Sequence, residues 1–292
     1  MRRAILLLPF ALAACMTTAP AAPPAAPAAP AAAAVTENTP PCNAGTSILN
    51  AVLWTESAAE YRASALQTFA VARRALDQAL ADRNWAGAEE ETANDPSQPP
   101  AIILDLDETV LDNSGAETRF VRSGITYDIK AWKQWVNESA AGAVPGATEF
   151  LAYAKSRGVT PFYITNRELD EEAATLRNLE LLHFPLAADG STLMVRGKNG
   201  FTTSDKSPRR AAVAASYRVL LVLGDDLNDF VAANGKTAAE REQILGRTAE
   251  WWGTRWFILP NPMYGSFEAA AIGAGGTPCE KLQRKVEALR TR

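Results

Sequence analysis

The chain has 292 residues, of which 47% are hydrophobic and 21% are charged, and its formal net charge is -4 at pH 7. This length and apolar fraction suffice for one large domain, or for one domain that carries a cap. The sequence lacks the basic stripe that binding to a nucleic-acid polymer requires, and after its first residues no segment is long and apolar enough to span a membrane.

The first residues resemble the signal of a bacterial lipoprotein. Arg2 and Arg3 precede an apolar stretch at 4–13, which is shorter than the roughly 20 residues of a membrane-spanning helix. Small residues then precede Cys15, as in a lipobox. The resemblance implies that residues 1–14 are removed and that Cys15 is lipidated, and several acyl chains hold a protein stably at a membrane. The alternative is an ordinary signal peptide with an incidental cysteine.

Residues 15–41 are expected to link this anchor to the folded part. Five prolines interrupt a run that is mostly alanine, at Pro20, Pro23, Pro24, Pro27 and Pro30. Such a stretch is extended and semi-rigid, and it has no core-forming residues. Met16, rather than aspartate, follows the cysteine, which in bacterial lipoproteins favours the outer membrane over the inner membrane.

Two further cysteines, Cys42 and Cys279, lie near the two ends of the predicted domain at 42–292. An oxidising compartment permits a disulfide bond between them. Two unpaired, buried thiols are the alternative that the sequence leaves open.

From residue 48 onward the sequence predicts helices that alternate with short strands. Apolar residues at helical spacing predict a helix over 48–81, and the polar, proline-rich residues 84–100 predict a loop. Five short apolar runs predict strands, at 101–104, 160–164, 193–196, 219–223 and 255–259. Helical patterns lie around them, at 146–157, 169–182, 207–216 and 238–245. Ser207 is the predicted N-cap of the third of these helices, with Pro208 as its first residue.

Strands that alternate with helices are typical of a doubly wound parallel sheet. We therefore expect an α/β fold, a Rossmann-like parallel sheet with a mainly α-helical cap from about 45–95 and 113–141. Ligands of such sheets bind beyond the carboxyl ends of the strands. Polar groups occupy this edge at four places: Asp105, Asp107 and Thr109; Thr165 and Asn166; Lys206; and Asp225 to Asp229.

Asp105 and Asp107 suit the transfer of a phosphoryl group. They are two residues apart, so both can face one crevice if the segment is extended. One carboxylate can attack phosphorus and form an aspartyl-phosphate, and the other can protonate the leaving alkoxide and then deprotonate water. Because two carboxylates repel a phosphate dianion, we expect a hard cation such as Mg²⁺, with Asp225 and Asp229 as further acids around it.

Thr165 offers a hydroxyl donor and Lys206 a positive charge to the phosphoryl oxygens. Lys198 is an alternative that can reach the same edge. Lys206 is favoured because its position directly before a helix start aims it at a fixed site.

These motifs resemble, in type and order, those of the phosphohydrolases of the haloacid dehalogenase (HAD) superfamily. Over about 54–265 the resemblance narrows to the class C acid phosphatases, a family of bacterial lipoprotein acid phosphatases and 5'-nucleotidases. The stretches that carry it are SAAEY at 57–61, LDLDETVLDNS at 104–114, WKQWV at 132–136, AVPG at 143–146, YITNR at 163–167, KSPRR at 206–210, GDDLNDF at 224–230 and LPNPMYG at 259–265.

The resemblance implies a role for each matching residue. Asp105 is the expected nucleophile and a Mg²⁺ ligand, and Asp107 is the expected general acid and base, which gives the metal its backbone carbonyl. Asp225 is an expected metal ligand with Asp229 in support. The expected phosphoryl-binding residues are Thr165, Asn166 and Lys206.

Trp132 and Tyr264 match aromatic positions that enclose a nucleobase in this family. Flat aromatic faces stack on any base, so the resemblance implies tolerance among nucleoside monophosphates. Trp132 and Trp135 have helical spacing, which predicts that one faces the ligand and the other the core. Packing without a ligand is the alternative role of Tyr264. Phe267 stands where the family often has tryptophan, which is expected to loosen the base pocket.

The acidic cluster departs from the family at Asp226, where asparagine is frequent, and at Asn228, where aspartate is frequent. The number of acids is kept, so metal binding is still expected. The family also implies an acidic pH optimum.

Other functions remain open at this point. A HAD phosphotransferase fits the same motifs, whereas a dehalogenase does not need the leaving-group acid Asp107. A binding or adhesive lipoprotein without catalysis is disfavoured because every expected catalytic position is filled. The expected partners are a small phosphomonoester and, through Cys15, a membrane; the sequence leaves the oligomeric state open, with a dimer as one alternative.

Overall fold

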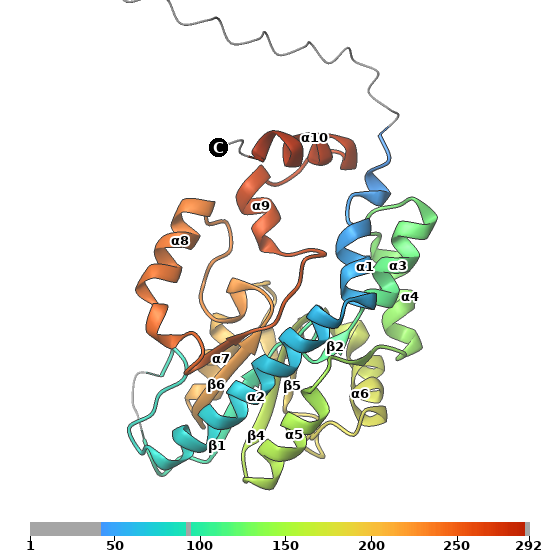
Figure 1. The fold of residues 1–292 in the computed structure, drawn as a ribbon. Helices are drawn as coiled ribbons and strands as arrows, with labels where there is room; N and C mark the ends of the chain where they lie inside the picture. The colour runs from blue at the N-terminus through green and yellow to red at the C-terminus, as the bar shows by residue number, and fades with distance from the viewer. Residues whose placement is uncertain (1–41, 92–94, 290–292) are drawn as a thin grey trace, which may run out of the picture. The chain divides into compact units, whose positions relative to one another are not determined.

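The computed structural model describes residues 42–91 and 95–289 (Figure 1). The predicted signal peptide, the lipidation site at Cys15 and the linker lie outside these residues. The described residues belong to one compact unit. Among the described residues, no helix is both long enough and apolar enough to cross a bilayer.

A five-stranded parallel sheet with the order β5-β4-β1-β6-β7 forms the centre of this unit. Its strands are β1 (Pro100–Leu104), β4 (Thr160–Glu168), β5 (Leu193–Arg196), β6 (Arg218–Gly224) and β7 (Trp256–Ile258). All five confirm strands predicted from the sequence. Because β1 pairs with β4 on one side and β6 on the other, residues after β1 emerge in the middle of the sheet edge.

Helices cover both faces of the sheet, which explains why its middle strand β1 is apolar throughout. Ile102 and Leu104 of β1 face one core, and Ala101 and Ile103 face the other. The first core includes residues of α2 (Ala59–Ala81), α5 (Ala147–Ser156) and α6 (Glu172–Leu181). The second includes residues of α7 (Ser207–Ala214) and α8 (Ala238–Arg247).

The single helix predicted over 48–81 is divided into α1 (Leu49–Ser57) and α2. The break is at Ala58, whose backbone is extended with φ -79° and ψ 130°. The change of direction lets α1 contact α3 (Ser114–Ser123), while α2 packs on the sheet against β6 and β7 (Figure 1). Tertiary contacts thus override a continuous helical pattern.

Some of the residues expected to form a cap pack against one another, and the others lie on the sheet. The short 3₁₀ helix η1 (Ala44–Thr46) and α1 lie against α3, and α4 (Ile129–Glu138) follows α3 in the 113–141 insert. Asp128 is the N-cap of α4, and its side chain accepts the backbone N–H groups of Lys130 and Ala131 at 3.0 and 2.9 Å. The other expected cap helix, α2, lies on the sheet.

Two helices at the end of the chain complete the same side of the molecule. Helix α9 (Ser266–Ile272) contacts α10 (Pro278–Ala288), and α10 contacts η1 (Figure 1). Cys42 and Cys279 form a disulfide bond with a Cα–Cα distance of 5.9 Å, which answers the question that the sequence left open. The bond joins the start of the described residues to α10.

The remaining elements are short. Strands β2 (Leu111–Asp112) and β3 (Gly142–Ala143) pair antiparallel at the two ends of the insert. The other 3₁₀ helices are η2 (Leu169–Glu171), η3 (Lys198–Gly200), η4 (Leu227–Asp229) and η5 (Ala249–Trp251).

Helix α7 starts one residue earlier than predicted, at Ser207, with Lys206 rather than Ser207 as its N-cap. The reason is that Asp205 accepts the Ser207 backbone N–H at 2.9 Å.

Candidate active site

A cavity of about 680 Å³ lies at the carboxyl ends of the strands. Its inner wall comes from the residues after β1 and β6 and from the end of β4, and its outer wall from α3, α4 and α10. It contains most of the site residues predicted from the sequence: Asp105, Asp107, Trp132, Asn166, Lys206, Asp225, Asp229 and Tyr264. The sheet therefore brings together side chains that are as far as 159 positions apart in the chain, from Asp105 to Tyr264.

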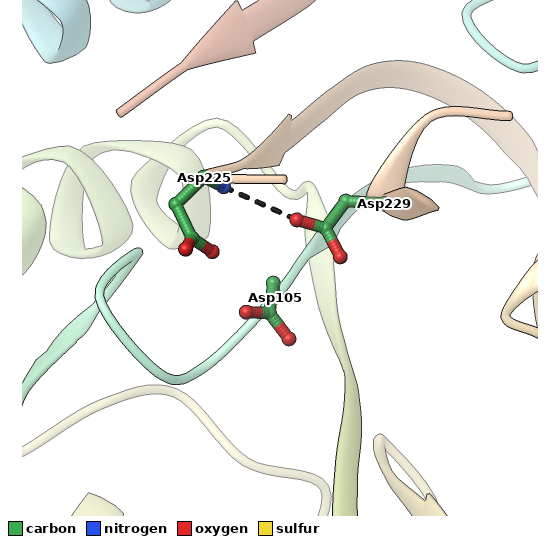
Figure 2. Close-up of side chains that lie close together, drawn as sticks. All are labelled: Asp105, Asp225 and Asp229. Carbon is green, nitrogen blue, oxygen red and sulfur yellow. Dashed lines mark hydrogen bonds between the residues drawn. The ribbon is translucent and has the colours of Figure 1, made fainter. Parts of the chain in front are cut away.

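Three carboxylates gather in the inner part of this cavity (Figure 2). Asp105 directly follows β1, and Asp225 and Asp229 follow β6; one oxygen of each lies within 4.8 Å of the others. Asp225 is oriented by donors from two other segments, the Thr109 hydroxyl at 3.3 Å and the Asn261 amide at 2.8 Å. These two donors hold the Asp225 carboxylate in place within the cluster.

Asp229 holds its own loop as well as Lys206. One of its oxygens accepts the backbone N–H groups of Asp225 and Asp226, at 3.1 and 2.9 Å, and the other accepts from Lys206 at 2.6 Å. The carboxylate lies so close to Gly224 that a Cβ at position 224 would overlap it. Glycine at the end of β6 is therefore a requirement of the site, which the sequence motifs did not reveal.

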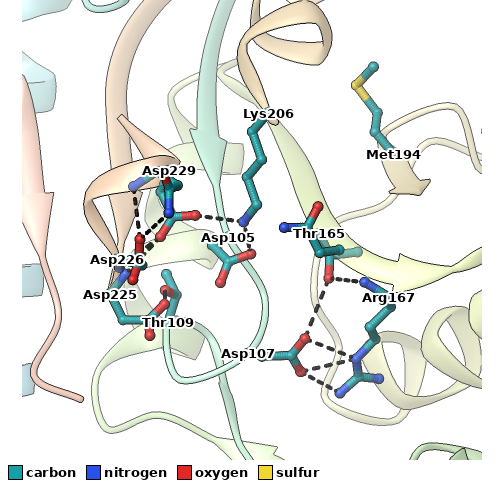
Figure 3. A network of polar contacts seen from close by, with 12 residues as sticks. Asp105, Asp107, Thr109, Thr165, Arg167, Met194, Lys206, Asp225, Asp226 and Asp229 are labelled. Atoms are coloured by element: carbon teal, nitrogen blue, oxygen red, sulfur yellow. Dashed lines mark hydrogen bonds and ion pairs between the residues drawn. The ribbon is translucent and has the colours of Figure 1, made fainter. Parts of the chain in front are cut away.

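Lys206 is the lysine that reaches the cluster. Its ammonium contacts Asp105 and Asp229, and the residue is only 5% exposed (Figure 3). Burial opposes its charge, but the two carboxylates outweigh burial and raise the pKa of Lys206 above its usual value. The rival Lys198 pairs instead with Glu172 at 2.6 Å.

The cluster holds more negative charge than Lys206 neutralises. Burial raises the pKa of Asp105 to about 7, with Lys206 opposing the shift and Asp229 and Asp107 adding to it. Burial, together with Asp229 and Asp105, also raises the pKa of Asp225 well above its ordinary value. Carboxylate oxygens at this spacing are the hard ligands that a divalent cation such as Mg²⁺ takes, and its charge would favour the ionised forms of Asp105 and Asp225. The residues present therefore fit a bound divalent metal.

Asp107 lies beside the cluster and faces Arg167 and Thr165 (Figure 3). Arg167 donates to it from Nη2 at 2.7 Å and from Nε at 3.0 Å, and the Asn113 amide donates at 2.9 Å. Thr165 is fully buried behind the cavity wall, and its hydroxyl donates to Asp107 at 3.4 Å and accepts the Arg167 backbone N–H at 3.1 Å. Arg167 and Asn113 stand inside the motifs YITNR and LDLDETVLDNS, but their residue types alone indicated no role.

Asn166 lies at the cavity with its amide already bonded within the protein. Its nitrogen donates to the Ser204 carbonyl at 3.1 Å, and its oxygen accepts from Arg209 at 2.7 Å. Arg209 is fully buried and also donates to the Thr165 carbonyl. These bonds hold the end of β4 in place.

The two aromatic residues predicted at the site both line the cavity. Trp132 is half-buried there, whereas Trp135 is buried in the core and donates to Asn113 at 2.8 Å, as the helical spacing predicted. Tyr264 lines the cavity from the loop before α9. Phe267 is 46% exposed and does not line it.

Asp226 points away from the three-carboxylate cluster. Its oxygens accept the backbone N–H and the hydroxyl of Ser266, both at 2.6 Å, and two donors of Asn228. It thereby connects the loop after β6 to the start of α9. The aspartate at this position is thus used for structure, although the sequence analysis counted it among the acids of the cluster.

The outer wall of the cavity holds residues that the sequence motifs did not indicate. Lys281 and Lys285 of α10 line it, and Lys285 pairs with Glu268 of α9. Glu117 of α3 also lines it, and burial, with a further contribution from Glu268, raises the pKa of Glu117 to about 7. These three residues lie in helices outside the sequence motifs, so no sequence pattern predicted that they line the cavity.

Comparisons with known proteins agree with this geometry. A family model described as HAD superfamily, subfamily IIIB (acid phosphatase), matches residues 18–267. The chain is similar to the structure of the class C acid phosphatase from Bacillus anthracis, with 31% sequence identity and a TM-score of 0.76. It is equally similar to a crystal structure of that protein with tungstate bound, with 32% identity and a TM-score of 0.76. Each match covers 86% of this chain and 100% of the other.

Proposed function

The chain belongs to the acid phosphatases of HAD subfamily IIIB, and from this premise we propose that it hydrolyses nucleoside monophosphates with Mg²⁺ through an aspartyl-phosphate on Asp105. The family membership confirms the resemblance seen in the sequence motifs, and the chain is thereby an acid phosphatase with a HAD-like fold. The observation that carries the mechanism is the buried contact of Asp105 with Lys206, beside Asp225 and Asp229.

In the proposed first step, an Asp105 oxygen attacks phosphorus and the bond from phosphorus to the leaving oxygen breaks. Asp107 gives its proton to that oxygen, so an alcohol departs and the phosphoryl group stays on Asp105. Lys206, whose ammonium group contacts Asp105, balances the charge of the phosphoryl oxygens.

In the second step, Asp107 takes a proton from a water molecule, which attacks the aspartyl-phosphate and releases inorganic phosphate. Asp107 is then protonated again for the next substrate. Asp105, Asp225 and the backbone carbonyl of Asp107 would hold the Mg²⁺, with Asp229 in support. The cation supplies positive charge between the carboxylates and the phosphate, which would otherwise repel each other.

The size and lining of the cavity support a nucleotide substrate. Its volume of about 680 Å³ far exceeds the space that one phosphate needs and lies within the range of small-ligand sites. Trp132 and Tyr264 line it and offer aromatic faces to a base. Because stacking does not distinguish bases strongly, the proposed enzyme accepts several nucleoside monophosphates.

The proposed location is the outer membrane of a bacterial envelope, through a lipid on Cys15. The lipobox-like start of the sequence motivates this proposal. The Cys42–Cys279 disulfide supports a location outside the cytoplasm, because such bonds persist in oxidising compartments.

Phosphate release tests the proposed activity. The substrates are a set of nucleoside monophosphates, sugar phosphates and p-nitrophenyl phosphate, each with Mg²⁺ or with a chelator. We expect turnover that needs Mg²⁺, prefers nucleotides and disappears in Asp105→Asn, whereas Asp189→Asn, at an exposed turn, serves as the matched control and keeps it. Equal rates on all substrates would contradict the stacking roles of Trp132 and Tyr264. Absence of turnover at every pH would instead favour a binding lipoprotein without catalysis.

A further inference from the structure

The Asp107 carboxylate is bonded unequally at its two oxygens. Oδ1 accepts three short bonds, from Arg167 Nη2 at 2.7 Å, from Arg167 Nε at 3.0 Å and from Asn113 Nδ2 at 2.9 Å. Oδ2 has only longer contacts, with Arg167 Nε at 3.3 Å and with the Thr165 hydroxyl at 3.4 Å. One oxygen is therefore anchored in the protein, and the other is left weakly bonded.

Arg167 is itself held from several directions. It is 3% exposed, and Nη1 donates to the Thr175 hydroxyl at 3.1 Å while Nη2 also donates to Asn113 Oδ1 at 3.3 Å. Its guanidinium lies 5.7 Å from the ring centroid of Trp132, which covers it from the cap. A buried guanidinium with these partners has little freedom, so its fork presents a fixed pattern of donors to Asp107.

Asn113 is fixed in the same way. Its backbone N–H donates to Glu108 at 2.9 Å, and its side-chain oxygen accepts from Trp135 Nε1 at 2.8 Å. The bond from Trp135 determines which end of the amide faces Asp107, because the oxygen is taken and only the nitrogen remains to donate.

We propose that Arg167 and Asn113 are positioning residues that anchor Asp107 Oδ1 and so leave Oδ2 to carry the proton to the leaving oxygen. This inference rests on the proposed function, in which Asp107 is the general acid. Proton transfer in the transition state needs the acid at hydrogen-bond distance and in the correct orientation, and a carboxyl group free to rotate about its Cα–Cβ bond would lose that orientation. Arg167 acts through Asp107 and not on the substrate.

The test compares two substrates of similar size whose leaving groups differ in basicity. p-Nitrophenolate leaves readily without a proton, whereas the benzyl alkoxide of benzyl phosphate needs one. The quantity to measure is kcat/KM, because it reports the step in which the leaving group departs and is unaffected by a slow hydrolysis of the aspartyl-phosphate.

We expect Arg167→Met to lower kcat/KM for benzyl phosphate about 100-fold, within the usual contribution of a general acid, and that for p-nitrophenyl phosphate less than about tenfold. Arg167→Lys keeps the positive charge but lacks the planar pair of donors. We expect its kcat/KM for benzyl phosphate to lie between those of the native enzyme and Arg167→Met. Asn113→Leu removes the second donor with little change of volume and shows the same selectivity. If Arg167→Met does not fold, Asn113→Leu and Arg167→Lys provide the test, by the same comparison of kcat/KM for the two substrates.

Two controls separate this inference from the proposed function. Arg209→Met removes another buried guanidinium of the site that does not contact Asp107. We expect it to lower kcat/KM for both substrates by the same factor. Asp107→Asn gives the selectivity of a lost general acid. If Asp107→Asn itself lowers kcat/KM for both substrates equally, the role of Asp107 as general acid in the proposed function is wrong. If Asp107→Asn discriminates and the Arg167 and Asn113 variants do not, the positioning role is overturned.

Discussion

The carboxylate of Asp229 illustrates how closely single residues are fitted at this site. It accepts two backbone N–H groups of its own loop and the Lys206 ammonium, and it packs directly on the backbone of Gly224. A carboxylate with this many donors supports its neighbours, and any displacement of it moves Lys206 as well. The residue at 224 therefore affects the chemistry without carrying a side chain.

A methyl group at position 224 is expected to displace Asp229. We expect Gly224→Ala to cost about 1–3 kcal/mol of folding free energy, as overpacking does, and to weaken the proposed Mg²⁺-dependent turnover. Urea unfolding and phosphate release measure the two effects. The matched control is Gly246→Ala in α8, where a Cβ meets no atom within 4 Å and alanine favours the helix. Equal behaviour of the two variants would contradict the close fit at Gly224.

Glu117 makes stability depend on pH. Burial, and to a lesser extent Glu268, raises its pKa from 4.5 to about 7, so the folded state binds this proton more tightly than the unfolded chain does. The contribution of the Glu117 carboxyl group to the free energy of unfolding is present in full below pH 4.5 and is lost as the pH rises to about 7. We expect Glu117→Gln to be more stable than the native protein above pH 7, by at most ~3 kcal/mol, and equal to it near pH 4.

Unfolding by urea at a series of pH values tests this expectation. The control is Glu149→Gln, at an exposed position of α5, which is expected to leave the curve unchanged. A difference between Glu117→Gln and the native protein that stays constant from pH 4 to pH 8 would show that the carboxyl group does not titrate in this range.

At the scale of elements, α9 and α10 depend on contacts with distant segments. Asp226 binds the first residue of α9, Lys285 of α10 pairs with Glu268 of α9, and Cys279 is bonded to Cys42. α10 has no buried residue, so a hydrophobic core of its own does not hold it. The disulfide is consequently the strongest attachment of this wall of the cavity.

The disulfide closes a loop with a sequence separation of 237 residues. Chain entropy alone assigns such a loop about 5 kcal/mol of stabilisation, which is an upper value because the denatured chain is not a random coil. We expect Cys279→Ser to lower the free energy of unfolding by up to that amount and to raise KM for nucleotides more than for p-nitrophenyl phosphate. Addition of a reductant should reproduce both effects in the native protein and change nothing further in Cys279→Ser. An unchanged midpoint of unfolding would contradict the stabilising role.

At the scale of the whole molecule, the site is the point where the segments after β1 and β6 and the end of β4 meet the cap and α10. A ligand bound there holds these segments together and stabilises the entire fold. The buried carboxylates are an energetic burden without a cation, since burial raises the pKa values of Asp105 and Asp225. Function and stability are therefore linked through the metal.

Mg²⁺ is expected to raise the thermal midpoint of the protein. At a concentration 100 times its Kd, the added stability is about 2.7 kcal/mol. Asp225→Asn should lose most of this increase, while Asp189→Asn, at an exposed turn, should keep it. Calorimetry with and without Mg²⁺ makes the comparison independently of catalysis, and an equal increase in both variants would place the cation elsewhere.

The alternation of strands and helices and the parallel sheet could be predicted from the sequence. So could the placement of four site residues at the edge of the sheet: Asp105, Asp107, Lys206 and Asp225. This was possible because a strand buried on both faces is a continuous apolar run, and because the carboxyl ends of parallel strands share one edge. Such signals are local, and they are read within a few residues.

The folded structure was needed to establish the break at Ala58, the contact of Lys206 rather than Lys198 with the cluster, the disulfide and the bonds of Arg167 to Asp107. The last pair is 60 positions apart in the chain, and Lys206 and Asp105 are 101 apart. Contacts at such separations leave no periodicity, because they depend on how β1, β4 and the helices pack in space. The residues that shape the site could be recognised within the sequence motifs. Which residues they contact could be established only from the folded structure.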